Sequence, residues 1–102
     1  MPGAKMTSEY KYDLVMTSKY KRDLKRMKKR GAKRSEIEVV IETLRKGEKL
    51  EAKYKDHQLR GNMRDFRECH IRPDWLLVYK VDKGKLILML TDTGSHADLF
   101  NM

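Results

Sequence analysis

The sequence has little cysteine, little proline and no long apolar run. Its 102 residues include one cysteine, Cys69, and two prolines. A single cysteine excludes a disulfide within the chain, and we expect Cys69 to be a small apolar side chain in a strand. No Cys or His spacing resembles a structural zinc module. The missing apolar run excludes a membrane-spanning helix, and the first residues lack the apolar core of a signal peptide. We therefore expect a cytoplasmic protein with no membrane partner.

The length and the composition indicate one globular domain. The chain is 39% hydrophobic and 38% charged, which is typical of a folded domain with a highly charged surface. We expect residues 1–9 to be a flexible N-terminal extension and residues 10–102 to form a single domain.

Acidic side chains are scarce in the first third of the chain. Residues 1–34 carry 12 Lys and Arg against 3 Asp and Glu, whereas residues 35–102 carry 12 of each, so the net charge of +9 lies in the first third. A one-sided positive charge attracts a polyanion, either nucleic acid or a strongly acidic protein. The alternative is a solubilising helix face, but so large an imbalance favours the polyanion.

The N-terminal part predicts a strand followed by a helix. Residues 10–17 alternate in part, which predicts a strand whose buried side carries Tyr10, Tyr12, Leu14 and Met16. Ser18 is the predicted N-cap of a helix that ends at Gly31. Its apolar stripe consists of Tyr20, Leu24 and Met27, and its remaining surface carries Lys21, Arg22, Lys25, Arg26, Lys28 and Lys29.

A second helix follows after a short connection. Ser35 and Glu38 form a capping-box pattern, and Gly47 ends the helix. The apolar positions recur at helical spacing at Ile37, Val40, Ile41 and Leu44. Two helices joined in this way form an αα-hairpin whose apolar stripes cover a sheet.

The C-terminal half predicts a meander of three strands. They span residues 66–71, 75–81 and 86–90, after a loop over residues 50–59. Residues 96–100 form one helical turn capped by Ser95. The predicted fold class is α+β: two N-terminal helices packed on one face of a small, mainly antiparallel sheet, in the order β-α-α-β-β-β with a short C-terminal helical turn. We expect the first strand at an edge of the sheet.

Ionisable side chains gather at the predicted strand ends. His70 and Asp74 bracket the turn at Pro73, and His96 follows the last strand. Because alternate strand ends of a meander meet, we expect these side chains at one end of the sheet, provided that the strand register is as assumed. His57 arrives from the preceding loop.

This inventory suits RNA cleavage without a metal or another cofactor. A base removes the proton of the ribose 2′-hydroxyl, the 2′-oxygen attacks the adjacent phosphate, and an acid protonates the leaving 5′-oxygen. Arg67 and Arg72 are candidates for stabilising the phosphate charge, and Trp75 and Phe100 for stacking on a base.

Each of these residues also has a structural alternative. A histidine of this kind is more often hydrogen-bonded or exposed than catalytic, and Asp74 is a turn former after proline. Trp75 suits the core, and both arginines suit an exposed strand. A metal site built from the three histidines and Asp74 ranks below proton transfer, because no local spacing such as His-x-x-x-His supports it.

Three segments carry a family resemblance. They are Lys55-Asp56-His57-Gln58-Leu59 with Gly61, then residues 67–79 with Cys69-His70-Ile71 and Pro73-Asp74-Trp75, and finally Thr93-Gly94-Ser95-His96 with Leu99-Phe100. In order and spacing they resemble the YafQ-like branch of the RelE/ParE bacterial toxin superfamily. Met63 departs from that branch, in which an aromatic is common at this position.

The resemblance implies a fold, an activity and partners. It implies a RelE-like toxin domain of a type II toxin–antitoxin system: a ribosome-dependent endoribonuclease that cuts mRNA in the A site by metal-free acid–base catalysis. The implied partners are the ribosome, mRNA and an acidic antitoxin protein that wraps the basic helices or covers the histidines. The basic helix would bind ribosomal RNA.

The resemblance also implies the catalytic positions, which are His57, His70, Asp74 and His96, with Phe100 as an accompanying aromatic. We expect His96 to be the general acid and Asp74 or His70 the general base. Two alternatives stay open: a ParE-like toxin that inhibits gyrase, which the clustered histidines argue against, and a non-catalytic RNA-binding module.

Overall fold

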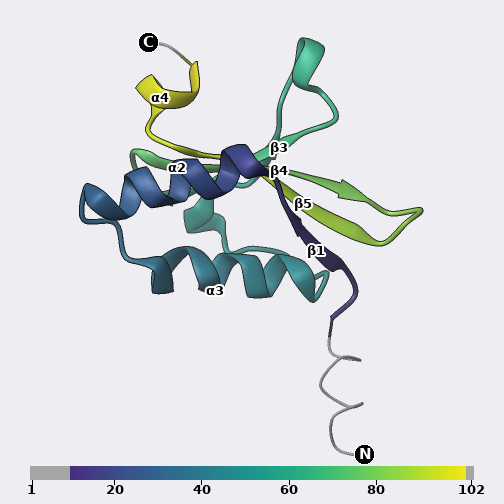
Figure 1. The fold of residues 1–102 in the computed structure, drawn as a ribbon. Coiled ribbons are helices and arrows are strands. Elements are labelled where there is room, and N and C mark those ends of the chain that lie inside the picture. Colours follow the sequence, from purple (N-terminus) through teal and green to yellow (C-terminus); the bar gives the residue numbers. More distant parts are fainter. Residues whose placement is uncertain (1–9, 101–102) are drawn as a thin grey trace, which may run out of the picture.

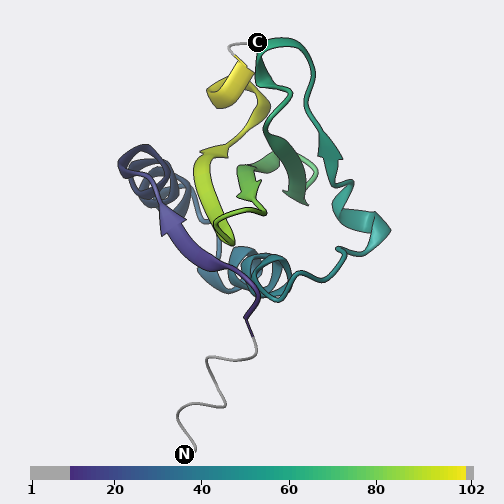
Figure 2. The same cartoon turned by 90° about the vertical axis from the view of Figure 1, so that its right-hand side faces the viewer.

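A computed structural model of the protein describes residues 10–100. The predicted extension, residues 1–9, and the last two residues of the predicted domain, 101–102, lie outside the described residues. Between them, two helices pack on one face of a five-stranded sheet with the strand order β1-β5-β4-β3-β2 (Figure 1, Figure 2). The predicted α+β fold class is confirmed.

The elements follow the predicted order with one addition. They are β1 (Asp13–Met16), α2 (Ser18–Lys29), α3 (Arg34–Arg45), β2 (His57–Gln58), β3 (Arg67–Arg72), β4 (Trp75–Asp82), β5 (Ile87–Gly94) and α4 (His96–Phe100). Two short 3-10 helices, η1 (Ala52–Tyr54) and η2 (Gly61–Met63), flank β2. The loop predicted over residues 50–59 is therefore wrong in part, because His57 and Gln58 pair with β3 as a fifth, edge strand.

β1 lies at the opposite edge, as predicted, and is the one strand of the sheet that runs parallel to its neighbour. It pairs with the first half of β5, from Asp13 opposite Ile87 to Met16 opposite Leu90. The buried side predicted for this strand holds for Tyr12 and in part for Leu14. Met16 is 42% exposed, so its predicted burial is wrong.

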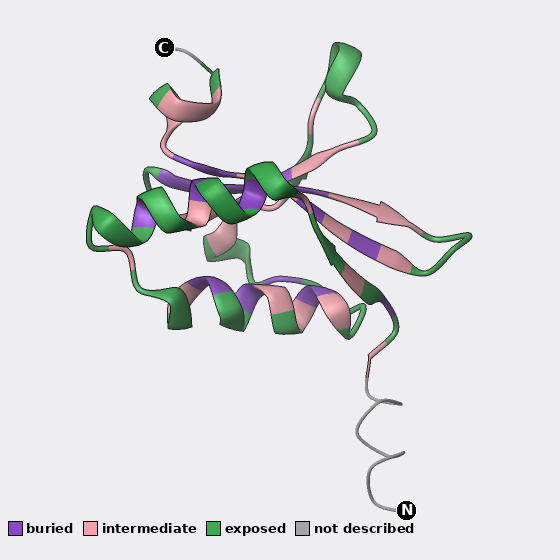
Figure 3. Cartoon of the chain, viewed as in Figure 1, coloured by how far each residue is buried: buried purple, intermediate pink, exposed green. Residues whose placement is uncertain are grey.

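The core lies between the helices and one face of the sheet (Figure 3). Its largest contributions are Tyr20 and Met27 from α2, Ile37, Val40 and Leu44 from α3, and Trp75, Leu77, Tyr79, Leu88 and Leu90 from the central strands. Leu76 and Val78 alternate with these residues on β4 and are also buried, as expected for a strand covered on both faces. Cys69 is fully buried in the core, and this burial raises the pKa of its thiol.

Both helices begin one residue or more before the predicted position. Thr17, not Ser18, is the N-cap of α2, because its Oγ1 accepts from the Tyr20 amide at 3.0 Å and donates to the Thr91 carbonyl at 3.0 Å. α3 begins at Arg34 after Lys33, with no side-chain cap. The predicted capping box is absent because Glu38 pairs with Arg34 at 2.8 Å.

Glycine ends both helices, as predicted. Gly31 and Gly47 have φ values of +98° and +76°, which glycine adopts without the penalty that a Cβ brings. Their amides donate to the carbonyls of Lys28 and Leu44. The amides of the following residues donate to the carbonyls of Met27 and Thr43, five positions earlier in the chain.

β5 continues four residues beyond the predicted end at Leu90. The bulge residue Thr91 donates its hydroxyl to the Val78 carbonyl at 3.1 Å, and Thr93 donates its hydroxyl to the Leu76 carbonyl at 2.6 Å. These hydroxyl groups satisfy backbone acceptors inside the sheet, so a segment that is polar in sequence remains a strand. The strand end predicted at Leu90 is therefore wrong.

The cap assignment is testable by alanine substitution. We expect Thr17→Ala to lower the free energy of unfolding by about 1 kcal/mol, because the first turn of α2 loses its hydrogen-bond acceptor. Ser18→Ala, at the neighbouring exposed position, is the matched control and should change it by less than about 0.5 kcal/mol. Urea denaturation of the two variants measures the difference. A larger loss for Ser18→Ala would contradict the assignment.

Candidate active site

The three histidines form a row at one end of the sheet. The ring centroids of His57 and His70 are 6.4 Å apart, and those of His70 and His96 are 5.7 Å apart. His57 lies on β2, His70 on β3 and His96 at the first position of α4. The structure thus brings together three side chains that are spread over forty residues of sequence.

A buried carboxylate lies beside the first two rings. Glu68 is 5% exposed, and its Oε1 is 3.3 Å from His57 Nε2 and 3.7 Å from His70 Nε2. Glu68 is not among the site residues that the sequence predicts. The available signal was the alternation of β3, which puts Glu68 and His70 on the same face, away from Cys69. Its pairing with His57 depends on the register of β2, which the sequence does not show.

Backbone geometry fixes the orientation of His57. Its Nδ1 is 2.7 Å from the carbonyl oxygen of Lys55, which can only accept, so Nδ1 carries a proton. Lys55 has φ of +48°, an unusual conformation for a residue with a Cβ. Such strain is often found at functional sites, where the surrounding structure holds the residue in place.

Asp74 orients His96 through two contacts. One oxygen, Oδ1, accepts from the His96 backbone amide at 2.9 Å and lies 2.7 Å from His96 Nδ1. These hydrogen bonds, first the backbone one and then the one from the ring, hold the pKa of Asp74 below its usual range. The carboxylate can only accept, so Nδ1 of His96 carries the proton and Nε2 is left for proton transfer. Phe100 lies one turn further along α4, with its ring 6.5 Å from that of His96.

Arg67 does not join the row. It alternates with Glu68 on β3 and pairs with Tyr79, whose ring is in the core. Its Nη2 contacts Asp56 Oδ2 at 3.0 Å, and the Tyr79 hydroxyl donates to the other oxygen of Asp56. The structure does not place Arg67 with the histidines, because this arginine belongs to a network on the opposite face of the sheet, and its contact with substrate stays a prediction. Asp56 serves this network and does not contact His57 in the described structure.

Trp75 is also placed elsewhere than predicted. It is 2% exposed, lies in the core, and donates from Nε1 to Thr93 Oγ1 at 2.9 Å. A buried ring offers no face to a nucleobase, so the predicted stacking role is wrong. Its structural alternative, a place in the core, is the one observed.

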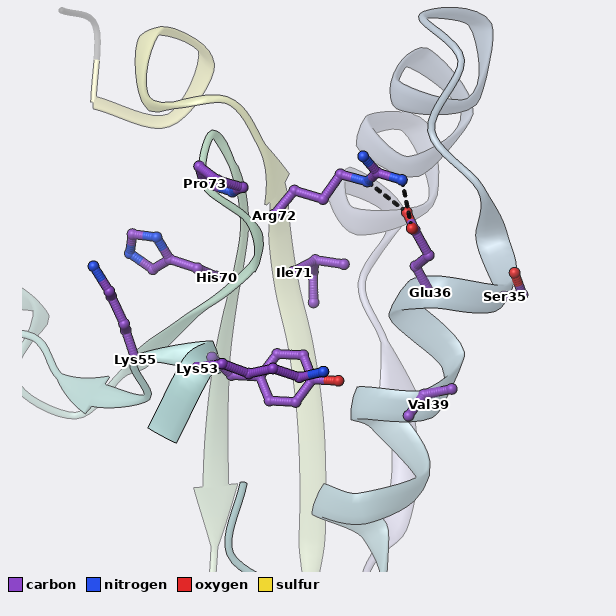
Figure 4. Close-up of a pocket in the computed structure, with 10 residues that line it drawn as sticks. Ser35, Glu36, Val39, Lys53, Lys55, His70, Ile71, Arg72 and Pro73 are labelled. Atoms are coloured by element: carbon purple, nitrogen blue, oxygen red, sulfur yellow. Dashed lines mark hydrogen bonds and ion pairs between the residues drawn. The ribbon is translucent and has the colours of Figure 1, made fainter. Parts of the chain in front are cut away.

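A groove of about 690 Å³ opens beside His70 (Figure 4). One wall comes from β3 and the following turn, the other from α3, and the floor from η1; the lining residues are Ser35, Glu36, Val39, Lys53, Tyr54, Lys55, His70, Ile71, Arg72 and Pro73. Arg72 points away from His70 and binds both oxygens of Glu36, at 2.8 and 2.6 Å. The predicted contact of Arg72 with substrate is therefore not supported, because its guanidinium holds α3 to the end of β3.

The predicted polyanion-binding residues lie on the outer face of α2. All six, Lys21, Arg22, Lys25, Arg26, Lys28 and Lys29, are exposed. Arg26 contacts Asp23 at 3.1 Å and Lys19 contacts the same carboxylate at 2.9 Å. Asp23 is 2% exposed and accepts from the Thr93 amide, so α2 is fastened to the end of β5 below its basic face.

Two structural features are absent from residues 10–100, a metal-binding cluster and a membrane-spanning helix. No group of three or more His, Cys, Asp or Glu side chains there is arranged to hold a metal ion. No helix in the same part of the chain has the length and the apolar character that crossing a membrane requires.

The lowered pKa of Asp74 gives a pH prediction. A carboxylate whose folded pKa is depressed stabilises the contact above its ordinary value of 3.8, and the contact is lost as pH falls through the lower, folded value. We expect the Asp74 carboxyl carbon signal in an NMR titration to show its own protonation transition centred below pH 3.8. The Asp74→Asn variant should lack this transition. A transition centred above 3.8 would contradict the assigned contact.

Comparisons with known proteins agree with this geometry. Residues 12–101 match the family model described as "Bacterial toxin of type II toxin-antitoxin system, YafQ". The mRNA interferase toxin YafQ of Escherichia coli strain K12 is 36% identical over 90 residues, which cover 86% of this chain and 95% of that protein.

Solved structures are similar over the same region. The E. coli DinJ-YafQ toxin-antitoxin complex contains a chain with a TM-score of 0.80 and 33% identity, covering 88% of this chain and 98% of that chain. A metal-bound toxin from Helicobacter pylori has a TM-score of 0.82 and 40% identity, covering 87% of this chain and 99% of that one. The resemblance inferred from the sequence motifs is confirmed, and this chain belongs to the YafQ family of bacterial type II toxin–antitoxin toxins.

Proposed function

We propose that this toxin is an endoribonuclease that cleaves mRNA. The observation that carries the proposal is the row of three imidazoles, in which Glu68 faces two rings and Asp74 holds the third. Its relatives in E. coli are named mRNA interferase toxins, which supports the same activity here. The toxin acts in the cytoplasm, where mRNA is translated.

The reaction needs one base and one acid on opposite sides of a phosphate. The base takes the proton of the 2′-hydroxyl, the 2′-oxygen bonds to phosphorus, and the bond to the 5′-oxygen breaks as the acid protonates it. This leaves a 2′,3′-cyclic phosphate on one fragment and a 5′-hydroxyl on the other. His70 and His96 are neighbours in the row, so that one phosphate can contact both rings.

The geometry supports distinct roles for the two histidines. His96, with Nδ1 bound to Asp74, presents Nε2 and serves as the general acid. His70 serves as the general base. Asp74 is better placed to orient His96 than to act as the base, since its Oδ1 already accepts from the His96 amide and ring.

His57 completes the row on the side of β2. One of its ring nitrogens faces the Lys55 carbonyl and the other faces the Glu68 carboxylate, so its ring is held beside His70. Since the histidines supply an acid and a base, the proposed reaction needs no metal ion.

The basic face of α2 supports a ribosome-dependent activity. Exposed lysine and arginine on one helix suit the phosphates of ribosomal RNA, and they add no sequence preference of their own. We propose that this face docks the toxin so that the histidines reach mRNA in the A site. The proposed antitoxin is an acidic protein that wraps the basic helices or covers the histidines, and the existence of an E. coli DinJ-YafQ toxin-antitoxin complex supports an antitoxin partner.

The catalytic assignment predicts the behaviour of His96→Ala. We expect this variant to lower the rate of mRNA cleavage in a translation reaction by about 100-fold or more, because the leaving oxygen loses its acid. Mapping of mRNA 5′ ends measures the cuts, with and without ribosomes. Lys83→Ala, in the exposed β4–β5 turn, is the control and should cleave as the wild type does.

Three outcomes would reject the assignment. Full cleavage by the His96→Ala protein would remove the proposed acid. DNA breakage without mRNA cleavage after expression would favour the gyrase-inhibiting alternative. Salt-sensitive RNA binding that ignores histidine substitution, together with unchanged growth, would favour the non-catalytic binding module.

The docking role of α2 predicts a charge-specific loss. Reversing Lys25 and Lys29 to glutamate should lower kcat/KM on translating ribosomes by about 10-fold or more, chiefly by slowing association at low salt. Reversing Lys83 and Lys85 at the β4–β5 turn changes the net charge equally and should have a much smaller effect. Equal losses for the two double variants would show that net charge alone matters.

A further inference from the structure

The short helix α4 is held by an ion pair from α2. Asp98, on α4, accepts from the Arg30 guanidinium through both oxygens, with Nη1 at 2.6 Å from Oδ2 and Nη2 at 3.2 Å from Oδ1. Arg30 follows directly after the last residue of α2, so the contact joins residues 68 positions apart. A two-point contact of this kind fixes orientation as well as distance.

Asp98 also caps the helix on which it lies. Its Oδ2 accepts from the Ser95 amide at 2.9 Å, while Ser95 Oγ accepts from the Asp98 amide at 3.1 Å. The two residues form a reciprocal cap at the start of α4. One carboxylate therefore serves both the internal structure of α4 and its attachment to α2. The same contacts, led by the Arg30 hydrogen bond, hold the pKa of Asp98 far below its usual range.

Gly94 allows this arrangement. A Cβ at Gly94 would lie 2.9 Å from both the Cβ and Oδ2 of Asp98, closer than such atoms approach. The end of β5 and the Asp98 side chain are thus packed directly against each other. In this arrangement α4 packs closely on the end of β5, and His96 at its start contacts Asp74.

α4 cannot keep its position by itself. It has five residues, none of them buried, and an isolated helix of this length is not stable in water. Its fixed points are the Asp74 contacts at His96 and the Arg30 contact at Asp98. If the second is lost, α4 is free to pivot about the first, and the Nε2 of His96 moves with it.

We propose that Arg30 and Asp98 are positioning residues for His96, and that they couple the basic helix α2 to the catalytic row. The proposal rests on the proposed nuclease function. Arg30 continues the basic run of α2, so the competing interpretation is that it binds an RNA phosphate directly. The geometry favours positioning, because the guanidinium is already engaged by both oxygens of Asp98.

Kinetics of Arg30→Ala and Asp98→Ala separate the two interpretations. For a positioning pair, each variant lowers kcat by about 10-fold with KM nearly unchanged, since a displacement of about 1 Å in a catalytic group can cost up to about 100-fold. The double variant then loses no more than the worse single variant. If Arg30 contacts RNA instead, Arg30→Ala raises KM, whereas Asp98→Ala frees the guanidinium and leaves cleavage unchanged or improved. This second pattern would overturn the proposal.

Conservative and control variants sharpen the test. Arg30→Lys keeps one charge-assisted contact, and Asp98→Asn keeps an acceptor for the Ser95 amide, so each should retain more activity than the alanine variant. Arg34→Ala breaks the exposed pair with Glu38 on α3, which has no link to α4, and should leave kcat unchanged. An equal loss in Arg34→Ala would reject a specific role for the Arg30 pair.

A readout on the free protein is independent of nuclease activity. In ¹⁵N NMR spectra of the wild type, we expect a protonated Nδ1 of His96 with a hydrogen-bonded proton signal. Asp98→Ala and Arg30→Ala should broaden or lose this signal, whereas Arg34→Ala should not. An unchanged His96 signal in both variants overturns the positioning proposal even if the toxin cleaves mRNA. If the wild type shows the signal but cleaves no mRNA, and the two variants lose the signal, positioning of His96 is sustained and the nuclease function is rejected.

Discussion

The site depends on the hydrogen bonds that Thr93 makes with Trp75 and Leu76 of β4 and with Asp23 of α2. The Thr93 hydroxyl accepts from Trp75 and donates to the Leu76 carbonyl, and its amide donates to Asp23 of α2. Because β1 pairs with β5 only as far as Leu90, the Thr93 amide faces no strand on that side, and a buried amide without a partner would be costly. Asp23 supplies the acceptor. This network keeps β5 extended to its end and so delivers His96 to the turn that carries Asp74.

The carboxylates give the histidines their distinct environments. Glu68 is buried and faces two rings, whereas Asp74 lies exposed on a turn and holds one ring through a single oxygen. The three imidazoles therefore differ in which ring nitrogen contacts a protein acceptor and which is available for proton transfer. Differences of this kind are what an acid–base reaction needs at neutral pH.

Sequence patterns predicted the fold class, the order of most elements and the gathering of the histidines, because alternation, helical spacing and turn residues are local signals. The parts that they missed depend on partners far away in sequence. Thr91 and Thr93 lie beyond the strand end predicted at Leu90, and they belong to the strand because their hydroxyls meet the β4 carbonyls. The contact of Arg67 with Asp56 depends on how the segment between η1 and β2 packs, and the contact of Arg72 with Glu36 depends on how α3 packs. No local sequence pattern encodes either arrangement.

The parallel pairing of β1 with β5 has a consequence for synthesis. The first strand of the sheet cannot pair until the last strand has been made. Thr17 bonds to Thr91 across 74 positions, and β5 ends at Gly94, two residues before His96. Contacts so distant in sequence form late. During translation, α2 and α3 emerge first, while the sheet edge and the histidine row stay incomplete until β5 and His96 have emerged as well. A nascent chain of this topology thus has no assembled histidine row until its last strand has emerged.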